Sequence, residues 1–83
     1  MITPEQKAKI KWNCRRGMLE LDLILNRFLN DGFALLSDEQ VINFETLLTY
    51  SDPQLYFWLM GQEEPDDEVI AEIVNTVRAL HRF

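Results

Sequence analysis

The chain has very few of the residues that build disulfides and metal centres. It contains one cysteine, Cys14, and one histidine, His81. A single cysteine excludes a disulfide within the chain, and this pair alone is too small for a zinc site. One thiol is typical of a protein from a reducing compartment. Arginines beside a thiol can lower its pKa, but we favour a small, semi-buried Cys14 on a helix.

Long hydrophobic runs are also missing. The longest are a few residues, such as YFWLM at residues 56–60, whereas a helix that spans a bilayer needs about 20. The N-terminal MITPEQKAKIKW has neither the apolar core of a signal peptide nor an Arg/Ser-rich presequence. We therefore expect no transmembrane segment, and a protein that stays in the compartment where it is made.

Positive charge is scarce except at one end of the chain. The net charge is −6, which argues against nucleic acid as the main partner. Residues 1–16 carry five basic residues and one acidic residue, a net +4, whereas residues 17–83 carry three basic and thirteen acidic residues, a net −10. These charges either belong to ordinary solvated helix faces or form a basic patch that steers an acidic partner surface.

The chain shows no recognisable catalytic arrangement. His81 lies near the C-terminus, and nothing in the sequence marks a nucleophile and an acid to accompany it. The acidic clusters at residues 63–64 and 66–68 stand beside a proline and a predicted helix start, where carboxylates are normally solvated. The calcium-loop and glycine-rich phosphate-loop motifs are absent as well. We expect an interaction module rather than an enzyme.

What the sequence does contain is a series of helix start and stop signals. Helices are expected to start at Thr3-Pro4, Ser37 and Ser51-Asp52-Pro53, with Asp52 as the N-cap of the third. A further helix should run from Met18 to Asn30-Asp31-Gly32, with Gly32 in the left-handed terminating conformation. The helix after Pro53 should end at Gly61, and the last helix should start near residues 66–68.

Apolar residues recur at helical spacing within these segments, and no segment alternates with period two. The fold class is therefore all-α, a compact bundle of about five helices in one domain over residues 1–83. Most of the core should come from the following residues and from the apolar stripe of the last helix. They are Phe28, Phe44, Leu47, Phe57 and Trp58, and the stripe comprises Val69, Ile70, Ile73, Val74, Val77 and Leu80.

One segment allows a functional interpretation as well as a structural one. Residues 12–22 read WNCRRGMLELD, with a glycine inside what resembles the start of an amphipathic helix. Glycine in a helix interior costs about 1 kcal/mol relative to alanine. On a helix, Arg16 and Glu20 would project from one face, and Gly17 would let another backbone approach between them. The alternative is a helix–helix junction at which Gly17 bends the chain and Arg16 pairs with Glu20.

This segment resembles the signature of the small FAD assembly factors of succinate dehydrogenase, whose hallmark is R-G-x-x-E. The matching positions are Arg16, Gly17 and Glu20. The K-x-x-I/W stretch before the motif and the LSDEQ helix start also look similar. SDPQLYFWLMG at residues 51–61 resembles the D-x-P-x-L-x-x-W-L-M segment of the same family. Together these matches cover nearly the whole chain.

The resemblance implies a five-helix chaperone of the bacterial cytoplasm. Such proteins bind the flavoprotein subunit of succinate dehydrogenase, and in some bacteria that of fumarate reductase. They promote covalent attachment of FAD to a histidine of that subunit, so FAD is the partner's cofactor and none is bound stably here. We expect a monomer when free, with no metal, no catalytic residue and no membrane insertion. The expected partner-binding residues are Lys9, Trp12, Arg15, Arg16, Gly17, Met18, Glu20 and Asp22.

Specific roles follow for the motif residues as hypotheses. Arg16 would contact carboxylates or carbonyls of the flavoprotein, Gly17 would permit close packing, and Glu20 would orient Arg16 or accept from a partner donor. Two other functions remain open. Some members of the family were described as antitoxins against a membrane-associated toxin, and a carrier of free FAD is a third class, although the chain lacks a dinucleotide fingerprint.

Overall fold

The computed structural model describes residues 3–80, and over this range the secondary structure is entirely helical. The prediction of an all-α fold with five helices is confirmed. In chain order the elements are α1 (Pro4–Asn13), α2 (Leu19–Asp31), the short 3₁₀ helix η1 (Phe33–Leu35), α3 (Asp38–Leu47), α4 (Asp52–Leu59) and α5 (Glu68–Leu80). His81 and Arg82 lie outside the described residues.

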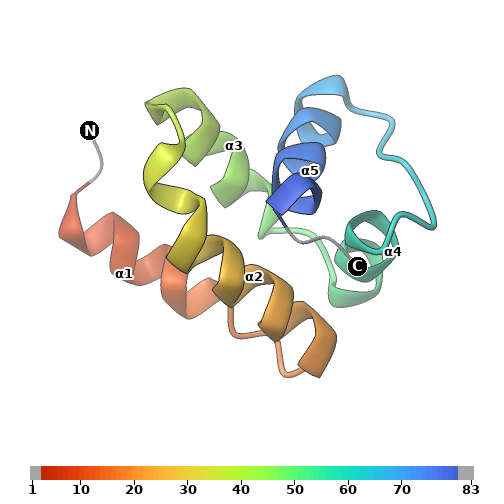
Figure 1. Ribbon diagram of the computed structural model, residues 1–83, viewed down its shortest axis with the longest axis horizontal. Helices are drawn as coiled ribbons and strands as arrows, with labels where there is room; N and C mark the ends of the chain where they lie inside the picture. Colours follow the sequence, from red (N-terminus) through yellow and green to blue (C-terminus); the bar gives the residue numbers. More distant parts are fainter. Residues whose placement is uncertain (1–2, 81–83) are drawn as a thin grey trace.

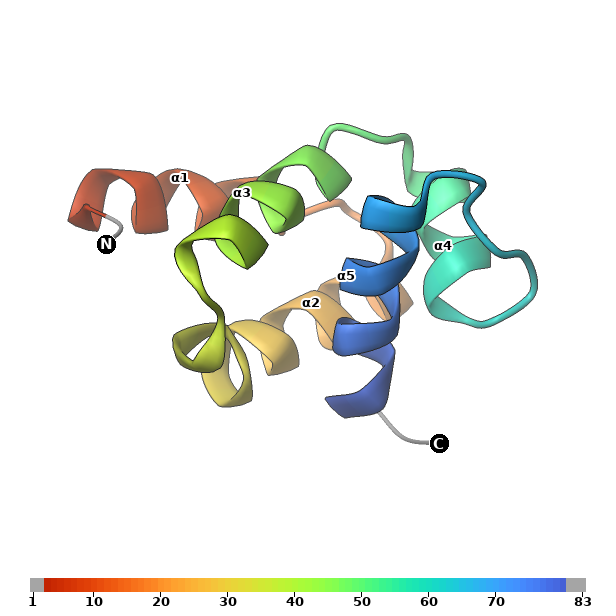
Figure 2. The ribbon, with the colours of Figure 1, turned by 90° about the horizontal axis from the view of Figure 1, so that it is seen from above.

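The last helix is the centre of the packing. α5 packs against α2, α3 and α4, and α2 also contacts α4. α1 lies at one end of the molecule and α4 at the other, in both views of the ribbon (Figures 1 and 2). No helix among residues 3–80 has the length and apolar character needed to cross a membrane.

Local capping signals predict the helix starts well, with one correction. The side chains of Thr3 and Ser37 accept hydrogen bonds from the backbone N–H three residues later, at 3.1 and 3.2 Å, and both form complete capping boxes. The prediction that Asp52 is the N-cap of α4 is wrong. Ser51 is the N-cap and accepts from the backbone of Gln54 at 3.4 Å. Asp52 is instead the first helical residue, with its carboxylate free for another contact.

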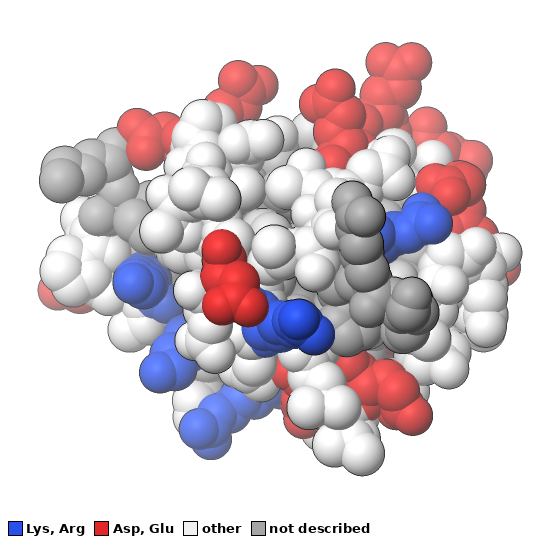
Figure 3. All heavy atoms as spheres, in the orientation of Figure 1, with Lys and Arg blue, Asp and Glu red and all other residues white. Residues whose placement is uncertain are grey.

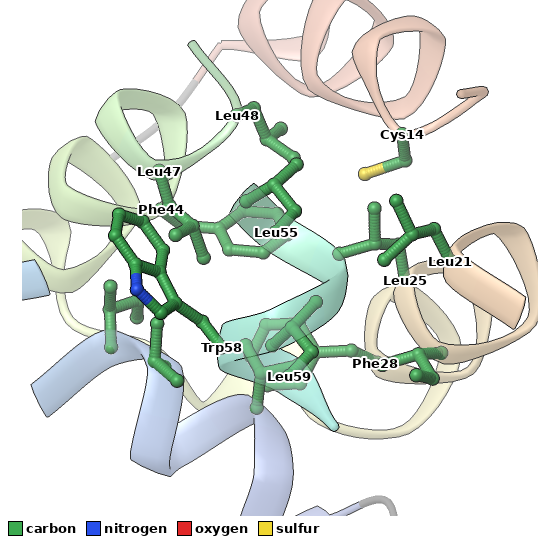
Figure 4. Close-up of a cluster of buried hydrophobic side chains, with 14 of the residues drawn as sticks. Cys14, Leu21, Leu25, Phe28, Phe44, Leu47, Leu48, Leu55, Trp58 and Leu59 are labelled. Atoms are coloured by element: carbon green, nitrogen blue, oxygen red, sulfur yellow. The ribbon is translucent and has the colours of Figure 1, made fainter. Parts of the chain in front are cut away.

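The core is built mainly from the residues that the periodicity selects. Phe28 and Phe44 are buried with ring centroids 5.2 Å apart, and Leu47 and Trp58 join the same cluster (Figure 4). Phe57, predicted to be in the core, is 40% exposed. At 100° per residue it points away from the face of α4 that buries Leu55, Trp58 and Leu59.

Two further predictions need correction, one about the burial of an apolar residue and one about the backbone conformation of a glycine. Val69, placed in the stripe of the last helix, is exposed, whereas Ile70, one residue later, is buried. Gly32 does not adopt the left-handed conformation, since its φ is −125°. A Cβ at Gly32 would lie 2.9 Å from both Leu80 Cδ2 and Phe28 Cε1. Close packing between the end of α2 and α5 is therefore what requires glycine at this position.

Candidate functional site: the connection between α1 and α2

Residues 14–18 connect α1 to α2 and are called here the Arg16 loop. α1 ends at Asn13 with Cys14 as its C-cap, and Met18 is the extended N-cap of α2. The expectation of a helical turn joining Arg16 and Glu20 is therefore wrong. A break between the two helices is expected from the sequence, because the apolar pattern of the second begins at Met18, and the structure confirms it, with α1 ending at Asn13 and α2 beginning at Leu19.

Gly17 adopts a backbone conformation that side chains disfavour. Its φ is +80°, in the left-handed region, where a non-glycine residue costs about 1–2 kcal/mol. Among residues 3–80, no atom apart from those of Gly17 and its two neighbours comes within 4 Å of the Cβ that a substitution would add. The backbone conformation thus explains the glycine, and the outer side of the loop at Gly17 is open.

The Arg16 side chain turns into the molecule. Its Nε donates to Asp52 Oδ1 at 2.7 Å, and its Nη1 donates to the carbonyls of Leu48 at 2.9 Å and Asn13 at 3.1 Å. Its Nη2 donates to the carbonyl of Tyr50 at 2.8 Å. The side chain is only 16% exposed. Arg16 therefore fastens the loop to the connection between α3 and α4.

Asp22 holds the loop from the opposite side. Its Oδ1 accepts a hydrogen bond of 2.7 Å from the backbone N–H of Arg16. Glu20 is exposed, and within the described part of the chain the ion-pair partner of Arg16 is Asp52. The proposed Arg16–Glu20 pair is thus corrected: Arg16 precedes the helix, so the helical spacing rule does not apply to it.

Cys14 is the first residue of the loop, and its side chain points inward and is completely buried, in the same apolar cluster as Leu21 and Leu25 (Figure 4). Burial raises the pKa of its thiol from 9.0 to about 12. The nearby charge of Arg16 lowers that pKa and the charge of Asp22 raises it, both by less than the effect of burial. Arginine activation of this thiol is therefore excluded, and Cys14 packs as a small apolar residue.

The eight predicted partner-binding residues fall into two groups. Arg16, Met18 and Asp22 are partly buried and help to hold the loop. The exposed group consists of Lys9, Trp12, Arg15, Gly17 and Glu20. Within it, Trp12 is 71% exposed, and the guanidinium carbon of Arg15 lies 6.0 Å from the centre of its ring.

Two exposed leucines beside the motif were missed by the sequence analysis. Leu19 is 70% exposed and Leu23 is 60% exposed. At 100° per residue both lie on the face of α2 opposite its buried residues, and Glu20 lies close to that face. The available signal was a pair of leucines at i and i+4 that the apolar stripe of the helix does not include.

An open groove of about 410 Å³ lies between α1 and α3, and its lining includes Asn13, the residue before the Arg16 loop. Lys9 and Asn13 line its α1 side, and Ile42 and Glu45 line its α3 side. Asn13 also supplies a carbonyl to Arg16, and Thr49, another lining residue, follows Leu48, whose carbonyl Arg16 also contacts. Lys9 thereby joins the surface around the loop.

Charge is distributed unevenly over the molecule. Basic side chains gather at the lower left of the face shown in Figure 3, where α1 lies, and acidic side chains predominate along the top and the right. This agrees with the charge difference between residues 1–16 and the rest of the chain. Among residues 3–80 no three Cys, His, Asp or Glu side chains are placed to hold a metal ion.

Comparison with known proteins gives a consistent result. A family described as the flavinator of succinate dehydrogenase matches residues 8–81. The protein called FAD assembly factor SdhE in Legionella pneumophila (strain Lens) is 49% identical over 73 residues, which is 88% of this chain and 91% of that protein. Proteins of the same name from Vibrio cholerae and Coxiella burnetii are 42% and 40% identical over 95% and 96% of this chain, and 92% and 98% of their own lengths. The chain belongs to the succinate dehydrogenase flavinator family.

Proposed function

We propose that this chain binds the flavoprotein subunit of succinate dehydrogenase, or that of fumarate reductase, and promotes covalent attachment of FAD to it. The relatives are named FAD assembly factors, which supports the flavinylation role. The observation that carries the proposal is the Arg16 loop. It is anchored from within by Arg16 while Gly17 and Glu20 remain exposed, so the motif offers a fixed outer surface to a partner.

The proposed mechanism is stabilisation of a reactive arrangement in the partner. A flavin–histidine bond forms only when the isoalloxazine ring and the accepting histidine are held close and correctly oriented. A protein that prefers the conformation of the partner in which they are so held raises its population. This chain then acts as a chaperone and not as an enzyme. It binds no FAD stably, acts in the bacterial cytoplasm and is a monomer when free.

The exposed and the partly buried residues of this surface have different roles. Gly17 lets the partner approach closely, Glu20 accepts from a donor on the partner, and Trp12 and Arg15 border the contact. Lys9 extends it toward the groove between α1 and α3. Arg16, Met18 and Asp22 keep the loop in shape, because their polar or apolar groups already have partners within the chain.

Covalent flavin in the partner is the direct test. A bacterial strain that lacks its own assembly factor would express the flavoprotein with this chain, with Glu20→Ala, or with Glu63→Ala as an exposed acidic control. Flavin fluorescence of the denatured subunit reports the covalent bond. We expect full fluorescence with the unaltered chain and with Glu63→Ala, and a loss of at least tenfold with Glu20→Ala. No gain of fluorescence with the unaltered chain would refute the proposed function.

A further inference from the structure

Asp52 lies 36 residues after Arg16 and, among residues 3–80, is the only carboxylate partner of the Arg16 side chain. Its Oδ1 accepts from Arg16 Nε at 2.7 Å, and the two side chains are 16% and 34% exposed. The usual task of an aspartate at this place, capping the helix, belongs to Ser51. The carboxylate of Asp52 is therefore available for a contact outside α4.

The acceptors around Arg16 suit a guanidinium in particular. The carbonyls of Leu48 and Tyr50 follow the end of α3, where backbone oxygens lack partners within the helix. A guanidinium presents five N–H groups in a rigid fork, and four hydrogen bonds from three nitrogens are made here. An ammonium group would not reproduce this geometry, so the site both neutralises and orients Arg16.

Asp52 supplies the one negative charge in this set. The other three acceptors are neutral carbonyls, and hydrogen bonds to an ionised acceptor are roughly twice as strong as neutral ones. Asp52 also stands in the first turn of α4, where the positive end of the helix favours a carboxylate. The helix α4 thus sets the position of the Asp52 carboxylate, and that carboxylate can hold the Arg16 loop in place through its contact with Arg16.

We propose that Asp52 is a positioning residue for partner binding: it sets the conformation of the Arg16 loop through Arg16 and does not itself contact the flavoprotein. The inference rests on the proposed function for its effect on flavinylation. It also has a consequence within the isolated chain, because Cys14, the first residue of the same loop, is buried. Weakening the Arg16–Asp52 contact should expose that thiol more often.

The first experiment measures flavinylation of the purified apo-flavoprotein with FAD, at increasing concentrations of this chain. Asp52→Ala should raise the half-saturating concentration about tenfold, because one charge-assisted contact is lost. The maximal rate should be unchanged. Asp52→Asn, whose amide oxygen can still accept from Nε, should recover most of the affinity. Val74→Ala, a buried change in α5, is the control for lost stability and should leave the half-saturating concentration unchanged.

A double-mutant cycle separates action through Arg16 from direct contact. On an Arg16→Ala background, Asp52→Ala should add less than twofold to the half-saturating concentration, and Arg16→Gln serves the same cycle if Arg16→Ala does not fold. An additive effect of the two changes would overturn the inference, since Asp52 would then act independently of Arg16. An unchanged half-saturating concentration for Asp52→Ala alone would overturn it as well.

The second experiment uses the chain alone and does not depend on the proposed function. The rate of Cys14 labelling by a thiol reagent, under native conditions, reports openings of the Arg16 loop. Asp52→Ala should accelerate labelling at least tenfold beyond the increase that its change in global stability produces, with Val74→Ala as the reference. Acceleration that merely follows global stability refutes the positioning role. Failure of the unaltered chain to support flavinylation refutes the proposed function instead.

Discussion

At the scale of single residues, Gly17 and Arg16 together set the conformation of the Arg16 loop, Gly17 through its backbone and Arg16 through its side-chain hydrogen bonds. The sequence marks Gly17 as unusual and leaves two interpretations open, a glycine inside a helix or a junction between two helices at which Gly17 bends the chain; the junction is confirmed. The structure shows a left-handed φ in a connection between two helices. Arg16 departs further from expectation, because three of the four acceptors of its side chain lie 32 to 36 residues away in the sequence. No pattern within residues 12–22 contains that information.

The conformation of Gly17 predicts a ranking of substitutions. Gly17→Ala should lower the free energy of unfolding by about 1–2 kcal/mol, because the left-handed conformation penalises a Cβ. Gly17→Asn should lower it less, since asparagine tolerates this region better. The added side chain meets open space, so the backbone alone sets the cost. Urea unfolding measures both values, and an alanine variant as stable as the unaltered chain would contradict this interpretation.

The buried thiol of Cys14 should make the free energy of unfolding depend on pH in the alkaline range. Burial raises its pKa to about 12, so above pH 9 the folded chain keeps a proton that the unfolded chain releases. Stability from this group is fully present below about pH 9 and falls as pH rises toward 12, by at most about 1.4 kcal/mol per pH unit. Urea unfolding between pH 8 and 11 should show a steeper loss for the unaltered chain than for Cys14→Ala. Parallel slopes would be inconsistent with a buried neutral thiol.

At the scale of elements, the sequence predicts helix starts best where the signal is short-ranged. The capping boxes of Thr3 and Ser37 involve residues three apart, so they can be recognised without the fold. The cap of α4 was misassigned by one residue, and only the structure shows why the difference matters: Asp52 is committed to Arg16. The face of a short helix is similarly uncertain in advance, as the exposed Phe57 shows.

The outer face of α2 carries a prediction of its own. Leu19→Ser and Leu23→Ser remove exposed side chains, so each should change the free energy of unfolding by less than about 0.5 kcal/mol. If this face meets the partner, each should raise the half-saturating concentration for flavinylation at least fivefold. Leu35→Ser, in the exposed part of η1, is the matched control. If all three changes raised the half-saturating concentration equally, the contact with the partner would not lie on this face of α2.

At the scale of the whole molecule, charge is the feature that the sequence predicts most directly. The five basic residues among the first sixteen all lie in α1 or the Arg16 loop, at one end of the fold. They therefore lie next to the surface proposed to bind the flavoprotein. Composition gave the sign of this charge, but the structure was needed to place Lys9 in the open groove that α1 and α3 line together.

This arrangement predicts association that depends on salt. If the basic end steers an acidic surface of the partner, the association rate should fall about tenfold between low and high ionic strength. Lys9→Gln should reduce both the rate at low salt and its salt dependence. Arg27→Gln, which removes a charge paired with Asp31 on α2, should alter neither. Stopped-flow mixing with the flavoprotein measures these rates, and a salt-independent rate for the unaltered chain would exclude steering.

The central claim is that the outer surface of the Arg16 loop promotes flavinylation by contacting the flavoprotein. Gly17→Leu tests it most directly, because the Cβ of the new side chain lies on the open outer side of the loop, more than 4 Å from the rest of residues 3–80 apart from its two neighbours. The measurement is covalent FAD incorporated into the purified flavoprotein. It is made at a temperature where urea unfolding shows the variant to be more than about 95% folded. Gly17→Ala, the smaller change at the same position, is the control. The account predicts that Gly17→Leu loses at least tenfold more incorporation than Gly17→Ala at comparable folded fractions. Incorporation that only follows the folded fraction in both variants would contradict it.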